Sequence, residues 1–445
     1  MRARVAAPVC LLLFLFASPA LSQTLRIYHI DVDQASATLF VAPSGKSLLV
    51  DAGKNGHGAR LRAAMQAAGV TQIDFFVNTH YHEDHLGGID DLVHASVTVA
   101  KAFDRGDKCC VSTKTKNTGA YKDYLLVLGN AAEALTRGKT IPLDPLMTVT
   151  SIAAGGAVLG ETNPPQPGQD ENDMSVSLLI TFAGFRYFIG GDTETATETK
   201  IAARDLVTDV DMYVADHHGA ENGSAQGLLD DMKPNVVIIS NGNRADYKHP
   251  QQSMLNRTGA LVPAPVIFQT NKYLHTGDDG GNVADEFIAD LEAVDDDGTI
   301  LVTVDAAAGN YQVAWRNQTR TFAVKHPAAP PAAPVAAAAT LVIADLLPDP
   351  SGSDTQDEEV TLRNKGTAAV SLAGWFLRDE SGRVWALASL GTLDVGEAKT
   401  IKRGGMAMSL NNDRDEIVLL DAAGHEQDRF SYTGSQVGVR ISTGH

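Results

Sequence analysis

The chain has 445 residues, more than a single hydrophobic core ordinarily supports, so two or three domains are expected. Its 44% hydrophobic and 20% charged residues are typical of a soluble globular protein. The formal net charge of −18 argues against broad nonspecific binding to nucleic acid or anionic membranes, although it is compatible with a local basic groove.

The N-terminal residues predict an export signal. Arg2 and Arg4 precede the apolar stretch VCLLLFLFASPA, which is too short to span a bilayer. The small residues Ala20 and Ser22 favour cleavage after Ser22, and an uncleaved anchor is the alternative. No later stretch is apolar enough for a transmembrane helix. We therefore expect a secreted or periplasmic protein that loses residues 1–22.

The three cysteines provide no disulfide framework. Cys10 lies within the expected signal, and Cys109 and Cys110 are adjacent, so two plain thiols in a loop are expected, with a strained vicinal disulfide or an intermolecular bridge as the alternatives. A zinc site built from several cysteines is excluded by this count.

Residues 23–324 predict mixed α and β structure, because β-type runs alternate with stretches of helical periodicity. Polar clusters follow several of the expected strands, where loops held by a sheet tend to carry active sites. Strands are expected at 24–31, 37–43, 47–53, 72–80, 97–103, 148–154, 211–219 and 234–242, helices at 58–70 and 121–138, and a hairpin at 174–192 turning at Ala183–Gly184.

The composition changes after residue 324. Residues 325–340 form a Pro/Ala tract that predicts a semi-rigid linker. Residues 341–445 contain short β-type runs with regularly spaced turn signals, which indicate an all-β sandwich.

A group of histidines and acids follows the expected strand at 72–80. His80, His82, Asp84 and His85 offer imidazole and carboxylate donors that suit zinc and similar first-row ions. In an extended turn the two pairs reach two neighbouring points, which favours two adjacent ions. A solvated polar loop is the alternative. Glu83 has no assigned role, and we expect it to point away.

The sequence HYHEDHLGG resembles the signature of the metallo-β-lactamase superfamily. LLVDAG, FIGGDTE, ADHHGA and NRADYKHP appear in the matching order and are most similar to the ComEC-like subgroup. The resemblance implies a four-layer αββα fold for residues 23–324. EEVTLRNKG, Gly374–Trp375 and Asn411–Asn412 resemble the lamin tail domain, an immunoglobulin-like sandwich in which we expect Trp375 to be core. The overall class is therefore α+β followed by an all-β sandwich.

The superfamily resemblance implies a ligand set for two metal ions. One of the two adjacent histidines of ADHHGA would serve the second ion, but strand alternation leaves the choice between them open. Asp51 of LLVDAG would orient the site through a ligand. The implied ligands are His80 and His82 for the first ion, Asp84 and His85 for the second, Asp192 bridging both, and His217 or His218.

Two features depart from the family pattern. DQASA, residues 33–37, replaces G-Q-G-D-A and lacks its glycines and acid. Many members carry another histidine before the bridging aspartate, yet His94 lies too close to the first cluster to fill that role. Asn172, Asp173 or water would complete the first site instead.

The ComEC-like resemblance implies an exported dinuclear hydrolase that cleaves phosphodiesters, either nucleic acid or smaller phosphodiesters, with hydroxide held between two divalent ions. Zinc is the expected ion and manganese the alternative. Asp84 or Asp192 would orient the hydroxide. His249 of NRADYKHP would donate a proton or contact phosphate, and a helix-start histidine without special role is the alternative.

Two other functions remain open from the sequence. One is hydrolysis of a lactone, β-lactam or thioester at the same metals. The other is a non-catalytic surface-binding protein in which the C-terminal domain binds a surface, polymer or protein. A basic cluster after the metal loop would provide a local nucleic-acid contact, and its members are Lys101, Arg105, Lys108, Lys114 and Lys116.

Overall fold

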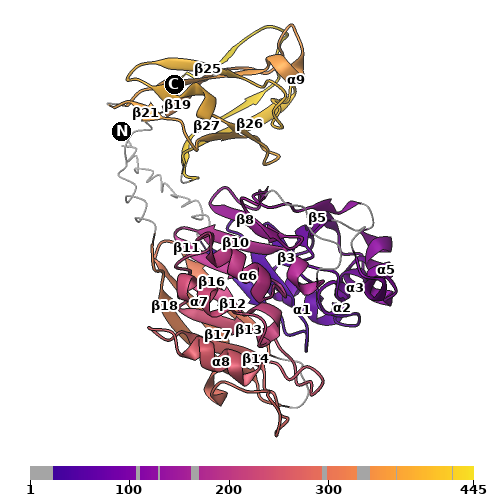
Figure 1. Cartoon of the computed structure of the whole chain (residues 1–445). Helices are drawn as coiled ribbons and strands as arrows, with labels where there is room; N and C mark the ends of the chain where they lie inside the picture. The colour runs from indigo at the N-terminus through magenta and orange to yellow at the C-terminus, as the bar shows by residue number, and fades with distance from the viewer. Residues whose placement is uncertain are drawn as a thin grey trace, which may run out of the picture. The chain divides into compact units, whose positions relative to one another are not determined.

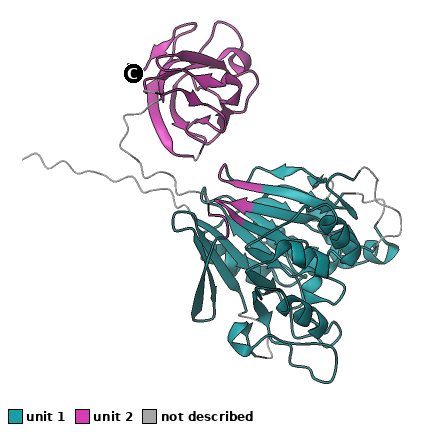
Figure 2. Ribbon diagram, turned by 60° about the vertical axis from the view of Figure 1, so that its left-hand side comes forward, with its two compact units in different colours: residues 1–144, 149–180, 186–324 teal, residues 145–148, 181–185, 325–445 magenta. Residues whose placement is uncertain are grey.

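The computed structural model describes residues 24–106, 111–128, 131–161, 170–292, 298–327, 341–366, 368–422 and 424–444. The expected signal at 1–22, Lys108, the Cys109–Cys110 pair and residues 328–340 of the expected linker lie outside these ranges. The chain divides into two compact units, coloured in Figure 2: residues 1–144, 149–180 and 186–324, and residues 145–148, 181–185 and 325–445. No helix in the described ranges is both long and apolar enough to span a membrane.

The first unit contains two large β-sheets (Figure 1). The first sheet has the order β18-β17-β16-β1-β2-β3-β4-β5-β6. It is antiparallel from β18 to β3 and parallel from β3 to β6. Its strands are β1 (Thr24–His29), β2 (Thr38–Val41), β3 (Ser47–Val50), β4 (Ile73–Val77), β5 (Val99–Asp104), β6 (Glu133–Ala134), β16 (Ile300–Asp305), β17 (Asn310–Trp315) and β18 (Gln318–Ala323).

Helices cover one face of the first sheet. Apolar side chains of three of these helices, such as Leu61, Leu92 and Tyr124, form one buried cluster with sheet residues such as Leu49 and Phe76. The helix at Gly58–Ala68 forms because its apolar residues recur at helical spacing. It ends at Gly69, whose backbone is left-handed. The helices are α1 (Gly58–Ala68), α2 (Glu83–Leu86), α3 (Gly88–His94), α4 (Thr113–Lys116) and α5 (Gly119–Val127).

The second sheet has the order β15-β14-β13-β12-β11-β10-β8-β7, with β9 paired to β8. It is parallel from β11 to β15, and helices pack on one face through residues such as Leu229 and Met254. The strands are β7 (Thr140–Ile141), β8 (Met147–Ala154), β9 (Ala157–Val158), β10 (Ser177–Phe182), β11 (Phe185–Ile189), β12 (Met212–Val214), β13 (Val236–Ile239), β14 (Val266–Asn271) and β15 (Ile288–Asp290). The helices are α6 (Thr195–Ala202), α7 (Gln226–Met232) and α8 (Gln252–Gly259).

The two sheets pack face to face. The rings of Phe40 and Tyr187 meet edge-on with centroids 5.2 Å apart, and those of Phe268 and Trp315 lie 4.7 Å apart. His29 of β1 is fully buried, with its ring 6.0 Å from that of Tyr187. With helices on both outer faces, this arrangement is the four-layer αββα fold that the resemblance implies.

The expected helix at 121–138 is wrong in its second half. α5 ends at Val127, and Glu133–Ala134 form β6, which pairs with β5 in parallel. Gly129 and Asn130 are poor helix formers, so extending the helix through them is unfavourable, and pairing with the sheet edge decides the structure beyond them. The hairpin turning at Ala183–Gly184 is present, with φ of 49° and 88° at the turn.

The second unit is an all-β sandwich. Two sheets with the orders β25-β20-β19-β28 and β23-β22-β26-β27 share one core, which includes Trp375 as expected and the fully buried Trp385. Its elements are β19 (Leu341–Leu347), α9 (Asp354–Asp357), β20 (Glu359–Asn364), β21 (Val370–Ser371), β22 (Phe376–Arg378), β23 (Val384–Ala386), β24 (Thr392–Leu393), β25 (Ala398–Lys402), β26 (Arg414–Leu420), β27 (Glu426–Thr433) and β28 (Ile441–Ser442).

Candidate metal centre

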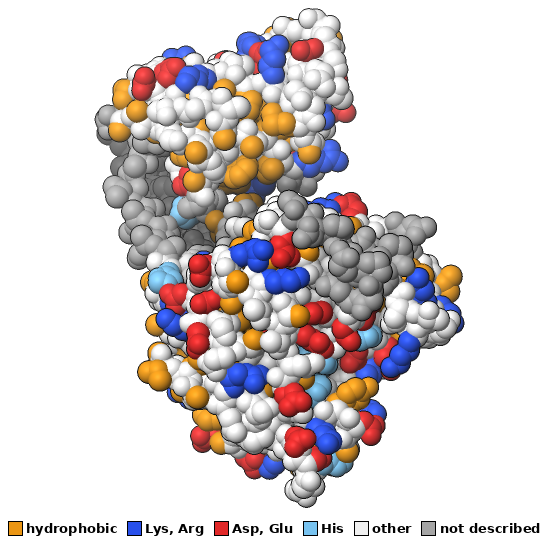
Figure 3. Space-filling view, viewed as in Figure 1, with side chains coloured by type: hydrophobic (Ala, Val, Ile, Leu, Met, Phe, Trp, Pro, Cys, Tyr) orange, Lys and Arg blue, Asp and Glu red, His pale blue; other side chains and the backbone are white. Residues whose placement is uncertain are grey.

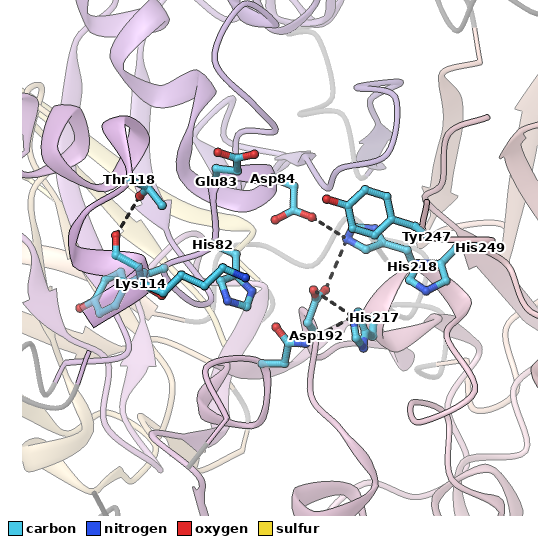
Figure 4. A pocket seen from close by; sticks show the side chains of 13 residues that line it. His82, Glu83, Asp84, Lys114, Thr118, Asp192, His217, His218, Tyr247 and His249 are labelled. Carbon is cyan, nitrogen blue, oxygen red and sulfur yellow. Dashed lines mark hydrogen bonds and ion pairs between the residues drawn. The ribbon is translucent and has the colours of Figure 1, made fainter. Parts of the chain in front are cut away.

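A pocket of about 340 Å³ lies at the ends of three strands of the first unit (Figure 4). The segment from His80 to His85 follows β4 in the first sheet, whereas Asp192 follows β11 and His217–His218 follow β12 in the second. The pocket is lined by Tyr81, His82, Glu83, Asp84, Lys114, Thr115, Thr118, Asn172, Asp192, His217, His218, Tyr247 and His249.

Three side chains form a first group of potential ligands. His80, His82 and Asp192 each present one donor atom, and these atoms lie within 4.8 Å of one another. The Nε2 of His80 lies 3.1 Å from the Nδ1 of His82 and 3.7 Å from the Oδ2 of Asp192. Two imidazoles and a carboxylate are an appropriate partial set for a first-row divalent ion.

Asp84, His85 and His218 form a second group within the same limit of 4.8 Å. The Oδ1 of Asp192 lies 3.0 Å from the Nε2 of His85 and 3.6 Å from the Nε2 of His218. One oxygen of Asp192 therefore faces each group, and this carboxylate lies between them.

Three buried atoms of these potential metal ligands have no hydrogen-bond partner among the described residues. They are the Nε2 atoms of His85 and His218 and the Oδ1 of Asp192. The Nε2 of His85 and the Oδ1 of Asp192 lie 3.0 Å apart. Two ligands of one zinc ion, each at about 2.0–2.1 Å in a tetrahedral shell, stand at a similar separation of roughly 3.3 Å. The buried atoms thus fit a bound divalent ion.

Other residues orient these ligands. The Nδ1 of His85 donates to the Oδ2 of Asp51 over 2.7 Å, and Asp51 also accepts from the backbone and hydroxyl of Thr79. The Nδ1 of His218 donates to the carbonyl of Ser240 over 2.9 Å. Because an acceptor holds Nδ1–H in both rings, Nε2 is the unprotonated nitrogen of each neutral ring and is free to bind metal. Asp51 thus lies where the resemblance places it.

The glycines of FIGGDTE let the end of β11 approach both histidine loops. A Cβ on Gly190 would lie 2.4 Å from the Oδ1 of Asp216, and one on Gly191 would lie 2.6 Å from the Oγ1 of Thr79. Gly191 also has a φ of 62°, which favours glycine. The absence of side chains at Gly190 and Gly191 therefore allows the close approach that places Asp192 between the two groups.

The structure distinguishes His217 from His218. Both have left-handed backbone, with φ of 52° and 54°, so they do not alternate as strand residues would. His218 belongs to the second group. His217 instead lies beside the first group, with its Nε2 3.9 Å from the Oδ2 of Asp192 and 3.3 Å from the Nδ2 of Asn172.

The two residues expected to complete the first site differ in position. Asn172 lines the pocket, and its Oδ1 is buried without a hydrogen-bond partner. The Oδ1 of Asp173 instead accepts from the backbone N–H groups of Glu194 and Thr197, both at 3.2 Å. Asn172 is therefore the better placed of the two, while Asp173 caps the start of α6.

Burial and neighbouring charges shift the pKa values of the potential metal ligands in opposite directions. Burial disfavours a charged His85 ring, but the carboxylates of Asp192 and Asp51 outweigh this effect and raise its pKa well above the ordinary value. Burial acts to raise the pKa of Asp192, but attraction to His85, His218 and His217 holds it well below the usual range. Ligating imidazoles must be neutral, so metal uptake releases a proton from His85.

His249 lies on the pocket wall, only 6% exposed. Burial, followed by the neighbouring His218 and His217, lowers its pKa to about 3. The ring is therefore neutral near pH 7, which favours the predicted phosphate contact over donation from a charged imidazolium.

Sequence reasoning missed four wall residues. Tyr81, Thr115, Thr118 and Tyr247 line the pocket but were not singled out, since isolated hydroxyl residues give no sequence signal. Glu83 is exposed on the rim and belongs to neither group, yet it lines the pocket. The expectation that it points away holds only with respect to the metal groups.

The described members of the predicted basic cluster differ in burial and partners. Arg105 is buried and paired with Glu171 through two hydrogen bonds of 2.7 and 2.9 Å. Lys101 pairs with Glu133, whereas Lys114 lines the pocket. On the face shown in Figure 3, described basic side chains are interspersed with acidic ones. Arg105 was the member misread, because its partner lies 66 residues away in sequence.

Comparison with known families agrees with this geometry. Residues 30–105 match the metallo-beta-lactamase superfamily. The first unit has the metallo-β-lactamase fold. Residues 334–434 match the Lamin Tail Domain, which accounts for the sandwich of the second unit. The metallo-β-lactamase fold supports a metal-dependent hydrolase, and its His and Asp groups are suited to a metal.

Two curated relatives cover about half of this chain at low identity. ComE operon protein 3 of Bacillus subtilis is 25% identical over 269 residues, which are 55% of this chain and 32% of that protein. Recombination protein 2 of Haemophilus influenzae is 25% identical over 255 residues, 56% of this chain and 28% of that protein. The chain thus spans about a third or less of the length of these relatives.

Similar solved structures include Zn(2+)-bound PqqB from Methylobacterium extorquens. It is 13% identical, with 55% of this chain and 97% of that chain covered at a TM-score of 0.36. A beta-lactamase from Chitinophaga pinensis is 16% identical, with 42% and 73% covered at a TM-score of 0.29. At TM-scores this low neither structure carries an argument, and the fold assignment rests on the family match and the topology.

Proposed function

We propose that this chain is an exported dinuclear metal-dependent phosphodiesterase. The observation that carries the proposal is the position of Asp192, whose two oxygens face two groups of ligands at one pocket. Two ions that share a carboxylate are the arrangement used by many phosphoester-cleaving enzymes. The relative named as a recombination protein supports nucleic acid, or a fragment of it, as the substrate.

The chain's residues would hold the ions as two neighbouring sets. His80 and His82 would bind the first ion, Asp84, His85 and His218 the second, and Asp192 both. The imidazole-rich donor set favours zinc, with manganese as the alternative. Bound ions would supply a water of lowered pKa and would neutralise charge on the attacked phosphoryl group.

Protein groups around the ligands would perform the remaining tasks. Asp51 and the Ser240 carbonyl hold the rings of His85 and His218 in the orientation that binding requires. Asp84 and Asp192 would accept hydrogen bonds from the attacking water and so orient it. Lys114 and His249 on the pocket wall would contact the phosphodiester.

The pocket favours a small or single-stranded substrate. Its volume of about 340 Å³ is at the lower end of the range for small-ligand sites, roughly 300–1,000 Å³. The net charge of −18 opposes a long basic track for a duplex. We therefore expect single phosphodiesters or the end of a nucleic-acid strand to bind.

The test compares substrates on the chain produced from Gln23, with bound metal quantified. Bis(p-nitrophenyl) phosphate, single-stranded DNA, plasmid DNA and nitrocefin are offered in turn. We expect turnover of the phosphodiesters that falls at least 100-fold in Asp192→Asn, because the shared ligand is weakened. Asp230→Asn is the matched control, because this exposed carboxylate on α7 lies outside the pocket.

Three outcomes would contradict the proposal. Cleavage of nitrocefin alone would assign the site to β-lactam or related acyl bonds. Unchanged turnover in Asp192→Asn would place the chemistry elsewhere. Failure to bind zinc or manganese would favour the non-catalytic binding protein. Export is tested separately by the mass of the N-terminal peptide of the secreted protein, which we expect to begin at Gln23.

A further inference from the structure

Gln34 has its amide orientation fixed by the backbone. The N–H of Gly242 lies 3.1 Å from the Oε1 of Gln34, and a backbone N–H can only donate. The oxygen of the amide therefore faces Gly242. The two loops touch closely at this point, since a Cβ on Gly242 would lie 2.3 Å from the backbone N of Gln34.

The other end of the same amide reaches His249. The Nε2 of Gln34 lies 3.1 Å from the Nδ1 of His249, and both side chains are buried. An amide nitrogen donates and cannot accept, so the Nδ1 of His249 must be the acceptor. Flipping the amide would oppose its NH₂ group to the N–H of Gly242 and leave two donors facing each other. The pair therefore has one consistent arrangement.

The proton of a neutral His249 ring is then on Nε2. Since Nδ1 is engaged by Gln34, Nε2 is the nitrogen left for the pocket that His249 lines. Figure 4 shows the His249 ring beside His217 and His218 on the pocket wall. The side chain thus offers the pocket a hydrogen-bond donor and no basic nitrogen.

We propose that Gln34 is a positioning residue that holds His249 as the Nε2–H tautomer, so that His249 donates a hydrogen bond to a phosphoryl or leaving-group oxygen. This inference rests on the phosphodiesterase function. It gives a role to Gln34, the polar residue that DQASA retains from G-Q-G-D-A after loss of the glycines and acid. No bond to hydrogen is broken at His249 in this role.

The decisive variant is Gln34→Glu, which keeps the shape of the side chain and replaces the donor by an acceptor. Imidazole ¹⁵N shifts of the zinc-loaded protein report the protonated nitrogen, and the His249 signals are identified by their loss in His249→Asn. We expect Nε2 protonated and Nδ1 unprotonated in the wild type. In Gln34→Glu we expect Nδ1 to carry a proton.

Turnover gives the second readout. Gln34→Glu is expected to lower kcat/KM for bis(p-nitrophenyl) phosphate about 10–100-fold with unchanged bound zinc. The same substitution in a His249→Phe background is expected to cause no further loss, because Gln34 acts through that ring. Gln72→Glu, at an exposed glutamine outside the pocket, is the control and is expected to retain wild-type activity.

The results separate this inference from the function on which it rests. A wild-type His249 protonated on Nδ1, or additive losses in the double variant, would overturn the role of Gln34. If no phosphodiester is cleaved, the proposed function fails, yet the ¹⁵N measurement still decides the tautomer. If Gln34→Glu does not fold, the wild-type shifts alone provide the test.

Discussion

His29 makes the stability of the first unit depend on pH. Its ring is fully buried between the two sheets, and neither ring nitrogen has a hydrogen-bond partner among the described residues. Burial lowers the pKa of His29 to about 3, from an ordinary value of 6.5. Between these values the unfolded chain binds a proton that the folded chain does not, so stability is lost as the pH falls below about 6.5.

The magnitude follows from the two pKa values. At pH 5 the unfolded histidine is almost fully protonated and the folded one is neutral, which removes about 2 kcal/mol relative to pH 8. Near pH 3, where the folded ring begins to bind a proton as well, the loss is about 4 kcal/mol. His29→Leu removes this contribution, so the stability of the variant relative to wild type should increase by about 2 kcal/mol between pH 8 and pH 5.

The assay must resolve one unit of a two-unit chain. Urea titrations with pulsed hydrogen exchange and mass spectrometry give the unfolding of peptides from β1 and β16, at equal metal content. His94→Leu, which removes an exposed histidine, controls for loss of one imidazole. A stability difference between wild type and His29→Leu that is the same at both pH values would refute the reasoning.

Three further predictions concern the site and its support. Lys114→Gln should raise the KM for bis(p-nitrophenyl) phosphate about 5-fold, since a charge-assisted contact of about 1 kcal/mol is lost, with zinc content and the exposed control Lys122→Gln unchanged in steady-state assays. Arg105→Met should lower the free energy of unfolding by about 3–5 kcal/mol because Glu171 is left buried and unpaired, whereas Arg105→Met with Glu171→Met should recover much of this loss in urea titrations. Asp51→Asn should weaken zinc binding about 10–100-fold by releasing the ring of its histidine partner, and competition with a chelator measures the change.

Local sequence was sufficient for the part of the site carried by one segment. His80 to His85 lie within a single turn after β4, so their spacing reports their proximity. The same holds for the hairpin at Ala183–Gly184, whose turn residues determine its position. The order of the other motifs predicted the fold through family resemblance, which spacing alone could not supply.

Residues that depend on contacts distant in sequence were harder to predict. The choice between His217 and His218 was inaccessible, because a left-handed turn replaces the strand on which alternation depends. Arg105 was read as a surface cation because its partner, Glu171, is brought beside it only by the fold. Gln34 reaches His249 across 215 residues, so its role has no local signal.

The two ligand groups have one more consequence. Each combines residues that follow β4 of the first sheet with one residue from a loop of the second, either Asp192 or His218. Neither sheet alone can therefore assemble a complete group. Bound ions would cross-link the two sheets of the first unit, so metal affinity would depend on how well these sheets are packed. A core substitution far from the pocket would then be detected first as a lower affinity for metal.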